Sequence, residues 1–240
     1  MTYLTRIGLA VLLAGGWSAS QAQSPDALRL QAFAQGQANN CISVALIKAA
    51  VQRYGIGQVF DTLRAGDQVR VTLRDHTVLT VTDAERRQAA RQAAFKRPPV
   101  AGLPATEQLA LISYAHLCYA VIAKYLQTQQ LYLCTNDNNQ PDATDALGSY
   151  DRALRKLSRK GICSDNDYRH LGLRALDPTA PPYNPGTDFS GHQGVVAYNH
   201  EHAVFVLGQQ YDCYGTWQPL AAQAVDAKNK FEPQWIFELK

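Results

Sequence analysis

The stretch QGQANNCISVALIKAAVQRYG, residues 35–55, decides the fold. Residues 41–54 predict a helix, and Gly55 predicts its end, because glycine readily takes the left-handed conformation of a helix C-cap. Apolar residues nearly encircle this helix. A helix that is apolar on almost every side is buried, so we expect it to form the centre of the core.

Cys41 stands at the first turn of this helix, because Asn39 or Asn40 is a natural N-cap. A thiol there faces the positive end of the helix dipole and free backbone N–H groups, which stabilise thiolate over thiol. The same N–H groups can stabilise an oxyanion beside the sulfur, and Gln35 can add a side-chain donor. The equally weighted alternative is a small apolar cysteine at the top of a core helix.

A reactive thiolate needs a base, and His202 is the best candidate among six histidines. The β-prone run that follows His202 predicts a rigid strand, and a catalytic imidazole is held by an oriented acceptor. Asp212, past a turn near Gly208, is the best local acidic partner. Direct pairing of His202 with Asp212 across a hairpin would centre the turn on Leu207, so a diagonal contact or a bulge is expected. We expect surface or structural roles for His76, His116 and His170.

These segments resemble papain-like and calpain-like cysteine peptidases. In that superfamily a Gln-Gly pair precedes the nucleophile by six residues, as in residues 35–41, and the catalytic histidine opens a His-Ala-Val strand, as His202 does about 160 residues later. The segment Gly215-Thr216-Trp217 is similar to the one after the third catalytic residue. The resemblance spans about 30 residues of the chain.

The resemblance implies that Cys41 is the nucleophile, His202 the general base and Gln35 an oxyanion donor. It implies a papain-like α+β fold, with a buried central helix carrying the cysteine and a C-terminal antiparallel sheet carrying the histidine. Two departures mark a distant branch. Ile42 stands where tryptophan is usual, and Asp212 lies closer to His202 than the family's third residue, an asparagine followed by Ser-Trp.

The rest of the chain also reads as α+β, with helices in the first two thirds and strands at the end. Thr82 and Glu85 form a capping box that opens a helix. The remaining expected helices are residues 106–126, a face made by Leu147, Tyr150, Leu154 and Leu157, and a short helix from Ser164. The expected strands are residues 68–73 and 77–81, joined at 74–76, then 194–198, 202–207, 211–214 and 234–239. A polar turn is expected at 136–144.

Residues 1–22 have the pattern of a secretory signal peptide, with Arg6, an apolar core at 7–17 and small residues before cleavage after Ala22. We therefore expect a secreted or periplasmic protein, one mature domain at 23–240 and no membrane span after signal removal. Thiols pair in oxidising compartments, and five cysteines leave at least one over. Local context favours Cys41 as the unpaired one. The other four would form two disulfides in one of three connectivities, of which Cys118–Cys134 with Cys163–Cys213 is favoured by its short loop; buried unpaired thiols are the alternative.

Composition narrows the function further. A net charge of +3 with 18% charged residues excludes a polycationic nucleic-acid wrapper, and the basic face at 152–160 is typical of a solvated surface. We predict a thiol-dependent hydrolase that cleaves an amide of a protein, peptide, glutamine side chain or peptidoglycan, with no cofactor or metal. A toxin neutralised by a partner protein is one biological role for this chemistry. Two alternatives stay open: a non-enzymatic secreted binding or structural protein, and a metal site at His192, His200 and His202, with Asp212 as a further candidate ligand.

Overall fold

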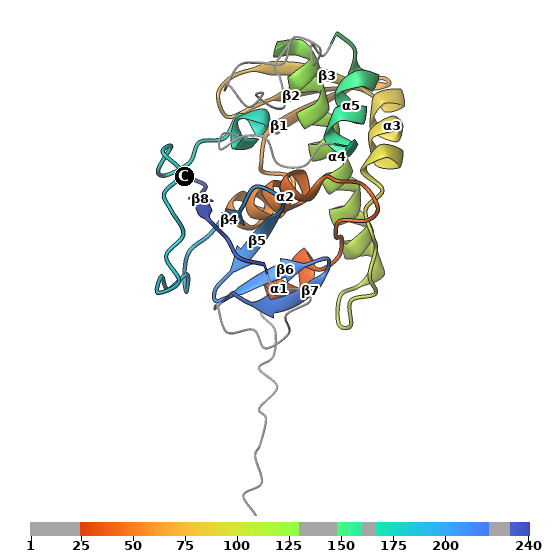
Figure 1. The fold of residues 1–240 in the computed structure, drawn as a ribbon. Coiled ribbons are helices and arrows are strands. Elements are labelled where there is room, and N and C mark those ends of the chain that lie inside the picture. Colours follow the sequence, from red (N-terminus) through yellow and green to blue (C-terminus); the bar gives the residue numbers. More distant parts are fainter. Residues whose placement is uncertain (1–24, 130–147, 160–166, 221–230) are drawn as a thin grey trace, which may run out of the picture.

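The structure is a computed structural model that describes residues 25–129, 148–159, 167–220 and 231–240 (Figure 1). The helices are α1 (Pro25–Leu30), α2 (Cys41–Tyr54), α3 (Asp83–Ala93), α4 (Ala105–Gln129), α5 (Tyr150–Arg159) and the 3-10 helix η2 (Asp167–Leu171). The strands are β1 (Asp61–Ala65), β2 (Gln68–Thr72), β3 (Val78–Thr82), β4 (Val195–Tyr198), β5 (Ala203–Leu207), β6 (Gln210–Cys213), β7 (Thr216–Pro219) and β8 (Trp235–Glu238). The predicted α+β class is confirmed.

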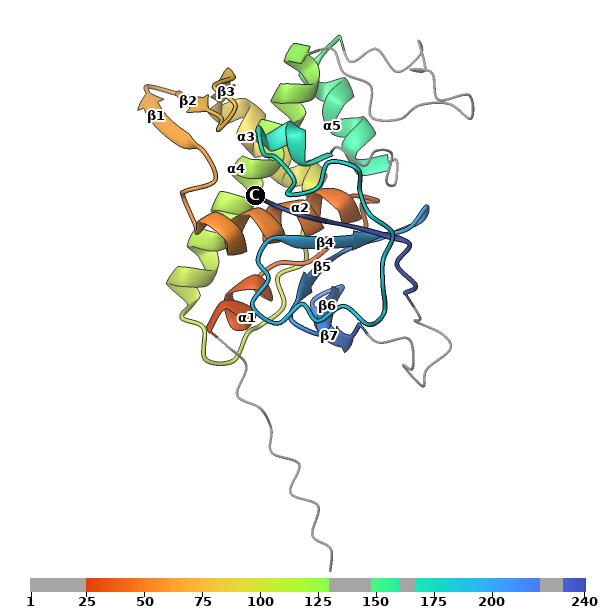
Figure 2. The same ribbon diagram turned by 90° about the vertical axis from the view of Figure 1, so that its left-hand side faces the viewer.

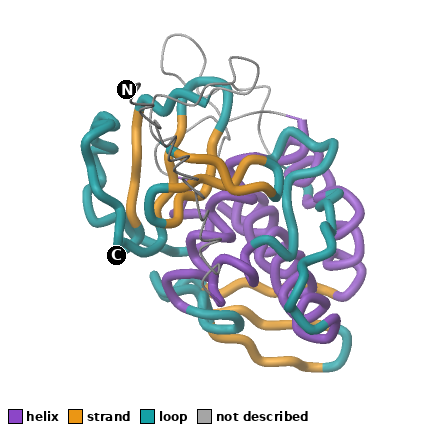
Figure 3. The backbone as a smooth tube through the Cα atoms, turned by 90° about the horizontal axis from the view of Figure 1, so that it is seen from below, coloured by secondary structure: helices purple, strands orange, loops and turns teal. Residues whose placement is uncertain are grey.

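Helix α2 lies between two layers, as Figure 2 shows from the side. One layer is a five-stranded antiparallel sheet in the order β7-β6-β5-β4-β8, and α2 packs on β5 and β4. The other contains α3, α4 and α5 beside a three-stranded sheet, seen from below in Figure 3. Every residue from Cys41 to Val51 is buried, as the apolar pattern predicts. This central burial fixes the start of α2 against the start of β5.

The five-stranded sheet has a second apolar cluster on the face away from α2. Ala203 and Phe205 belong to the main core with α2, whereas Val204 and Val206 pack with Tyr211 in the smaller cluster. Alternate residues of a strand point to opposite faces, so the run from Ala203 to Val206 is buried on both sides. A strand covered on both faces is a rigid support for the histidine that precedes it.

The smaller sheet confirms the hairpin predicted at residues 68–81. Strands β2 and β3 pair in antiparallel fashion around the turn at residues 74–76, where His76 takes a positive φ of 70°. The predicted capping box at Thr82 and Glu85 is present and opens α3. Strand β1 was not expected, because all five of its residues are exposed and show no alternation. Its pairing with β2 alone defines it.

Helix α4 is the longest described helix. By length and composition Ala105–Thr128 could cross a membrane, with a mean hydropathy of 1.5, but 61% of its apolar 18-residue window is buried inside the protein. It contacts α2, α3 and α5, as a core helix does. The inward face was expected to include Leu109, which is wrong. Leu109 is 60% exposed, because it lies on the outward face of α4 with Thr106 and Ser113, whereas Leu111 and Ile112 face the core.

Several expectations fall on residues outside the described ranges. They are the signal peptide at 1–22, the polar turn at 136–144, Leu147 and Ser164. Cys134 and Cys163 also lie there, whereas Cys118 and Cys213 are thiols in the structure. Burial raises the pKa of the Cys118 and Cys213 thiols. The two disulfide pairings remain predictions.

A buried histidine makes the stability of this fold sensitive to acid. His170 is 8% exposed, and burial lowers its pKa to about 4. The unfolded chain, with an ordinary pKa near 6.5, therefore binds the proton first as the pH falls. Stability is full above about pH 6.5 and is lost toward pH 4, by about 2 kcal/mol for this group between pH 7 and pH 5. Urea unfolding at both pH values should show this fall, and His170→Gln should reduce it; an equal fall in the variant would contradict the assignment.

Candidate active site

The cysteine of the candidate site begins α2 and is 5% exposed. Asn40 occupies the N-cap position, but its side chain makes no cap; the amide Nδ2 instead donates to the carbonyl oxygen of Ala93 at 2.9 Å. The first N–H groups of an α-helix have no intrahelical acceptor, and the first turn of α2 contains no acidic residue. The positive end of the helix dipole therefore acts on Cys41 without a nearby carboxylate on the same turn.

The histidine of the site is fixed by the turn between β4 and β5. Tyr198 pairs with Ala203, and the Asn199 N–H donates to the carbonyl oxygen of His202 at 2.9 Å. The Asn199 carboxamide oxygen in turn accepts from the backbone N–H of His202 at 2.8 Å. His202 therefore stands one residue before a rigid strand, with its backbone held at both polar groups.

The imidazole of His202 lies among aromatic rings. It stacks on Tyr214 with the ring centroids 5.3 Å apart and an interplanar angle of 24°, and it meets the edge of Phe231 at 5.8 Å. Burial lowers the pKa of His202, and the negative charge of Asp212 acts in the opposite direction. A neutral imidazole near neutral pH can accept a proton, which is the state that a general base needs.

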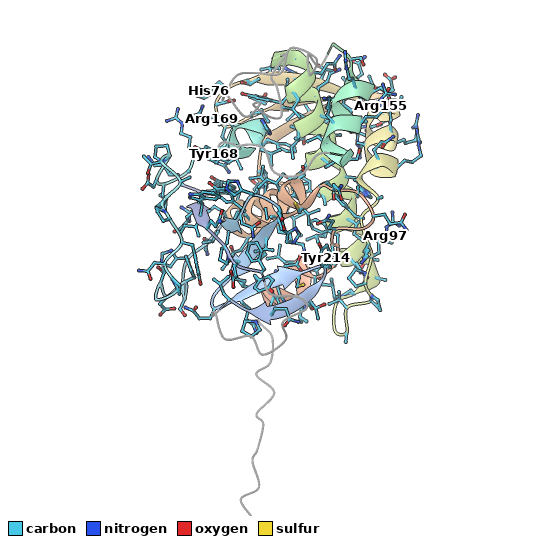
Figure 4. The ribbon with its side chains drawn as sticks, viewed as in Figure 1. His76, Arg97, Arg155, Tyr168, Arg169 and Tyr214 are labelled. Atoms are coloured by element: carbon cyan, nitrogen blue, oxygen red, sulfur yellow. The ribbon has the colours of Figure 1, made fainter. Side chains whose placement is uncertain are left out.

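One small cavity brings the sequence-predicted residues together. Gln35, Cys41, His202 and Asp212 all line it, and Tyr214 completes its wall. The cavity gives about 10 Å³ to the centre of a water molecule, which is room for about one water. Figure 4 shows Tyr214 next to the loop that leads into α2. Residues that are far apart in sequence thus line the same small cavity.

Asp212 does more than the sequence predicts. Its Oδ2 accepts from the Nζ of Lys48 at 2.7 Å, with both side chains buried, and its Oδ1 accepts from the N–H of Gly215 at 2.9 Å. The turn between β5 and β6 follows Leu207, which pairs with Gln210, so direct pairing around Leu207 does not occur. The carboxylate is anchored to α2 and to the next turn, and its charge still reaches His202.

Lys48 is the site residue that sequence reasoning missed. It lies seven residues after Cys41, two helical turns along the same face of α2, and its side chain is 0% exposed. Burial lowers its pKa, and Asp212 raises it. Its ammonium also lies 5.1 Å from the centre of the Phe33 ring. The available signal was a lysine inside an otherwise apolar buried helix, which needs a counter-charge in the core.

The loop before α2 is shaped by close contacts. Gln35 donates from Nε2 to the carbonyl oxygen of Ala38 at 2.8 Å, while its Oε1 is buried with no hydrogen-bond partner among the described residues. A Cβ on Gly36 would lie 1.9 Å from the carbonyl oxygen of Ala94, so only glycine fits. Gln35 therefore lines the cavity, and its hydrogen bond to Ala38 also fixes the conformation of its own loop.

Comparison with family models, curated proteins and solved structures finds no match. The site therefore rests on its own geometry. The histidines of the alternative metal site contact different residues. His192 Nδ1 is 2.7 Å from Glu238 Oε2, and His200 meets the Trp235 ring at 4.9 Å. Within the described ranges, no group of three His, Cys, Asp or Glu residues could hold a metal ion.

Proposed function

We propose that the chain is a papain-like, thiol-dependent hydrolase that cleaves an amide through Cys41, with His202 as general base. The observation that supports this most is the shared cavity of Cys41, from the start of a buried helix, and His202, from the start of a buried strand. The substrate amide belongs to a peptide, a glutamine side chain or a cell wall. The place of action is outside the cytoplasm, in keeping with the predicted signal peptide.

The chemistry follows from these positions. His202 takes the thiol proton to give a thiolate–imidazolium pair, and the Cys41 sulfur then adds to the amide carbonyl carbon. The developing oxyanion lies at the start of α2, where backbone N–H groups and the second N–H of the Gln35 amide can donate to it. The imidazolium then gives its proton to the leaving amine. Water, deprotonated by His202, hydrolyses the thioester to the acid and restores the thiol.

Asp212 acts in this proposal as a fixed charge. Its carboxylate favours the imidazolium form of His202, which appears during the reaction, and opposes the effect of burial. Its hydrogen bond to Gly215 holds the turn that carries Tyr214 against the imidazole. The role assigned from sequence, an acidic partner of His202, is retained as a proposal with Lys48 added to it.

Alkylation of the protein by iodoacetamide tests the proposed pair. We expect Cys41 to react at pH values well below about 8.5, where an ordinary thiol is mostly protonated. We expect His202→Ala to slow this reaction by about tenfold or more at pH 7, because the base is lost. Peptide mass spectrometry over a pH series reads the modification of each cysteine separately.

The controls lie in the same chain. Cys118 and Cys213, whose pKa values burial raises, should remain slow at neutral pH. His200→Ala removes a histidine two residues away that contacts Trp235 instead of the cavity, and should leave Cys41 as reactive as in the wild type. A Cys41 that is inert, or unaffected by His202→Ala, would reject the hydrolase and favour the non-enzymatic binding protein.

A further inference from the structure

We propose that Cys41 acts on acyl groups that carry a negative charge close to the scissile carbonyl, and that Lys96, next to the Tyr214 wall of the cavity, selects them. This inference rests on the proposed function, because it names the substrate class of the same site. It comes from the balance of charges inside the cavity and at its edge.

The inside of the cavity offers no unbalanced negative charge. Asp212 is the carboxylate that lines it, and the Lys48 ammonium neutralises that carboxylate at 2.7 Å. The other lining side chains are apolar or uncharged apart from the titratable Cys41 and His202. The first turn of α2 has no acidic residue to offset the positive end of its dipole. An anionic group that approaches the Cys41 sulfur therefore experiences a positive electrostatic field.

Backbone hydrogen bonds fix Lys96 next to the loop that precedes α2. Its N–H donates to the carbonyl oxygen of Ala34 at 2.9 Å, and the Ala34 N–H donates back at 3.1 Å, which ties it to the residue before Gln35. Its ammonium lies 5.7 Å from the centre of the Tyr214 ring. Tyr214 lines the cavity and is 48% exposed, so it borders both the reacting pair and solvent. The backbone bridge and the ring contact therefore place Lys96 beside the exposed wall of the cavity.

The charge of Lys96 is available to a ligand. Lys96 is exposed and forms no ion pair with any carboxylate in the described part of the chain. Glu201, which precedes His202 in sequence, is exposed. The carboxylate whose charge acts on the pKa of His202 is that of Asp212. A cation beside a low-dielectric cavity attracts anions more strongly than one on open surface, because the walls focus its field.

Arg97 provides a contrast with its neighbour Lys96. It is also exposed, but its positive charge acts on His116 of α4, whose pKa burial and that charge lower to about 4. Figure 4 shows Arg97 reaching outward at the side of the molecule. Two adjacent cations thus differ in what they face, and Lys96 is the one that lies over the wall of the cavity.

Two alkylating agents of nearly equal size, one charged and one neutral, test whether Lys96 favours a negatively charged reagent. Iodoacetate and iodoacetamide both form a bond from the Cys41 sulfur to a methylene carbon and release iodide, but only iodoacetate carries a carboxylate next to that carbon. The quantity measured is the ratio of their rate constants at Cys41, read by peptide mass spectrometry. We compare the wild type with Lys96→Gln, Lys96→Glu and the matched control Arg97→Gln.

We expect the iodoacetate-to-iodoacetamide ratio to fall about threefold in Lys96→Gln and further in Lys96→Glu, and to stay near the wild-type value in Arg97→Gln. High salt should reduce the difference in this ratio between Lys96→Gln and the wild type, because the Lys96 ammonium is exposed and therefore screened by ions. An unchanged ratio in both Lys96 variants, or an equal fall in Arg97→Gln, would overturn the charge selection. Failure of the hydrolase itself would appear separately, as Cys41 reactivity that His202→Ala leaves unaltered with both reagents.

Discussion

Replacing Lys48 by methionine is expected to lower the free energy of unfolding by about 3–5 kcal/mol, because the change leaves the Asp212 carboxylate buried without its partner. The two side chains are 0% and 6% exposed, and their charged atoms lie 2.7 Å apart. Methionine nearly fills the volume of lysine, so the loss measures charge more than packing. Urea unfolding at pH 7 reads the change.

The double variant Lys48→Met with Asp212→Asn separates charge from shape. Asparagine keeps an oxygen for the N–H of Gly215, so we expect most of the lost stability to return. The exposed pair Arg155–Asp151, at 50% and 44% exposure, is the matched control. Arg155→Met should cost at most about 1 kcal/mol. A loss below about 1 kcal/mol in Lys48→Met would show that the buried ion pair does not hold the site together.

Replacing Gly36 by alanine is expected to lower stability by about 3 kcal/mol and to slow alkylation of Cys41. The added Cβ would lie 1.9 Å from the carbonyl oxygen of Ala94, which is backbone and cannot rotate away. Two hydrogen bonds between Ala34 and Lys96 fix both segments. The clash therefore displaces the loop that carries Gln35 or breaks the hydrogen bonds between Ala34 and Lys96.

Gly148→Ala serves as the control for the Gly36 change. Among the residues that the structure describes, none lies within 4 Å of a Cβ at Gly148, and its φ is outside the positive region, so alanine fits there. We expect its stability to stay equal or to rise slightly, because alanine restricts the unfolded chain. Equal stability and equal Cys41 reactivity in both alanine variants would disprove the close approach at Gly36.

Local sequence patterns predicted the elements that local physics controls. The apolar helix from Cys41, the hairpin around residues 74–76 and the Thr82 capping box are all confirmed. Strands β1 and β7 were missed, because neither shows alternating burial and each is defined by pairing with a neighbour. Leu109 was placed inside although it lies on the outward face of α4.

The site was predictable in part for the same reason. Cys41, His202 and Gln35 carry short-range patterns, and the structure places them at one cavity. The partner of Asp212 was not predictable in this way, because Lys48 is 164 positions away and no local pattern joins them. Likewise, the bridge that brings Lys96 to Ala34 depends on how two loops meet. Such contacts are set by the whole core.

The thiolate absorbance of the protein over a pH series tests the central claim most directly. The quantity is the ultraviolet difference between the wild type and Cys41→Ser, in which the contributions of the other cysteines cancel. The account predicts a Cys41 thiolate signal that persists well below pH 8.5 and is lost from that range in His202→Ala. A difference signal that appears only above about pH 8.5, and is the same in His202→Ala, would contradict a Cys41–His202 catalytic pair.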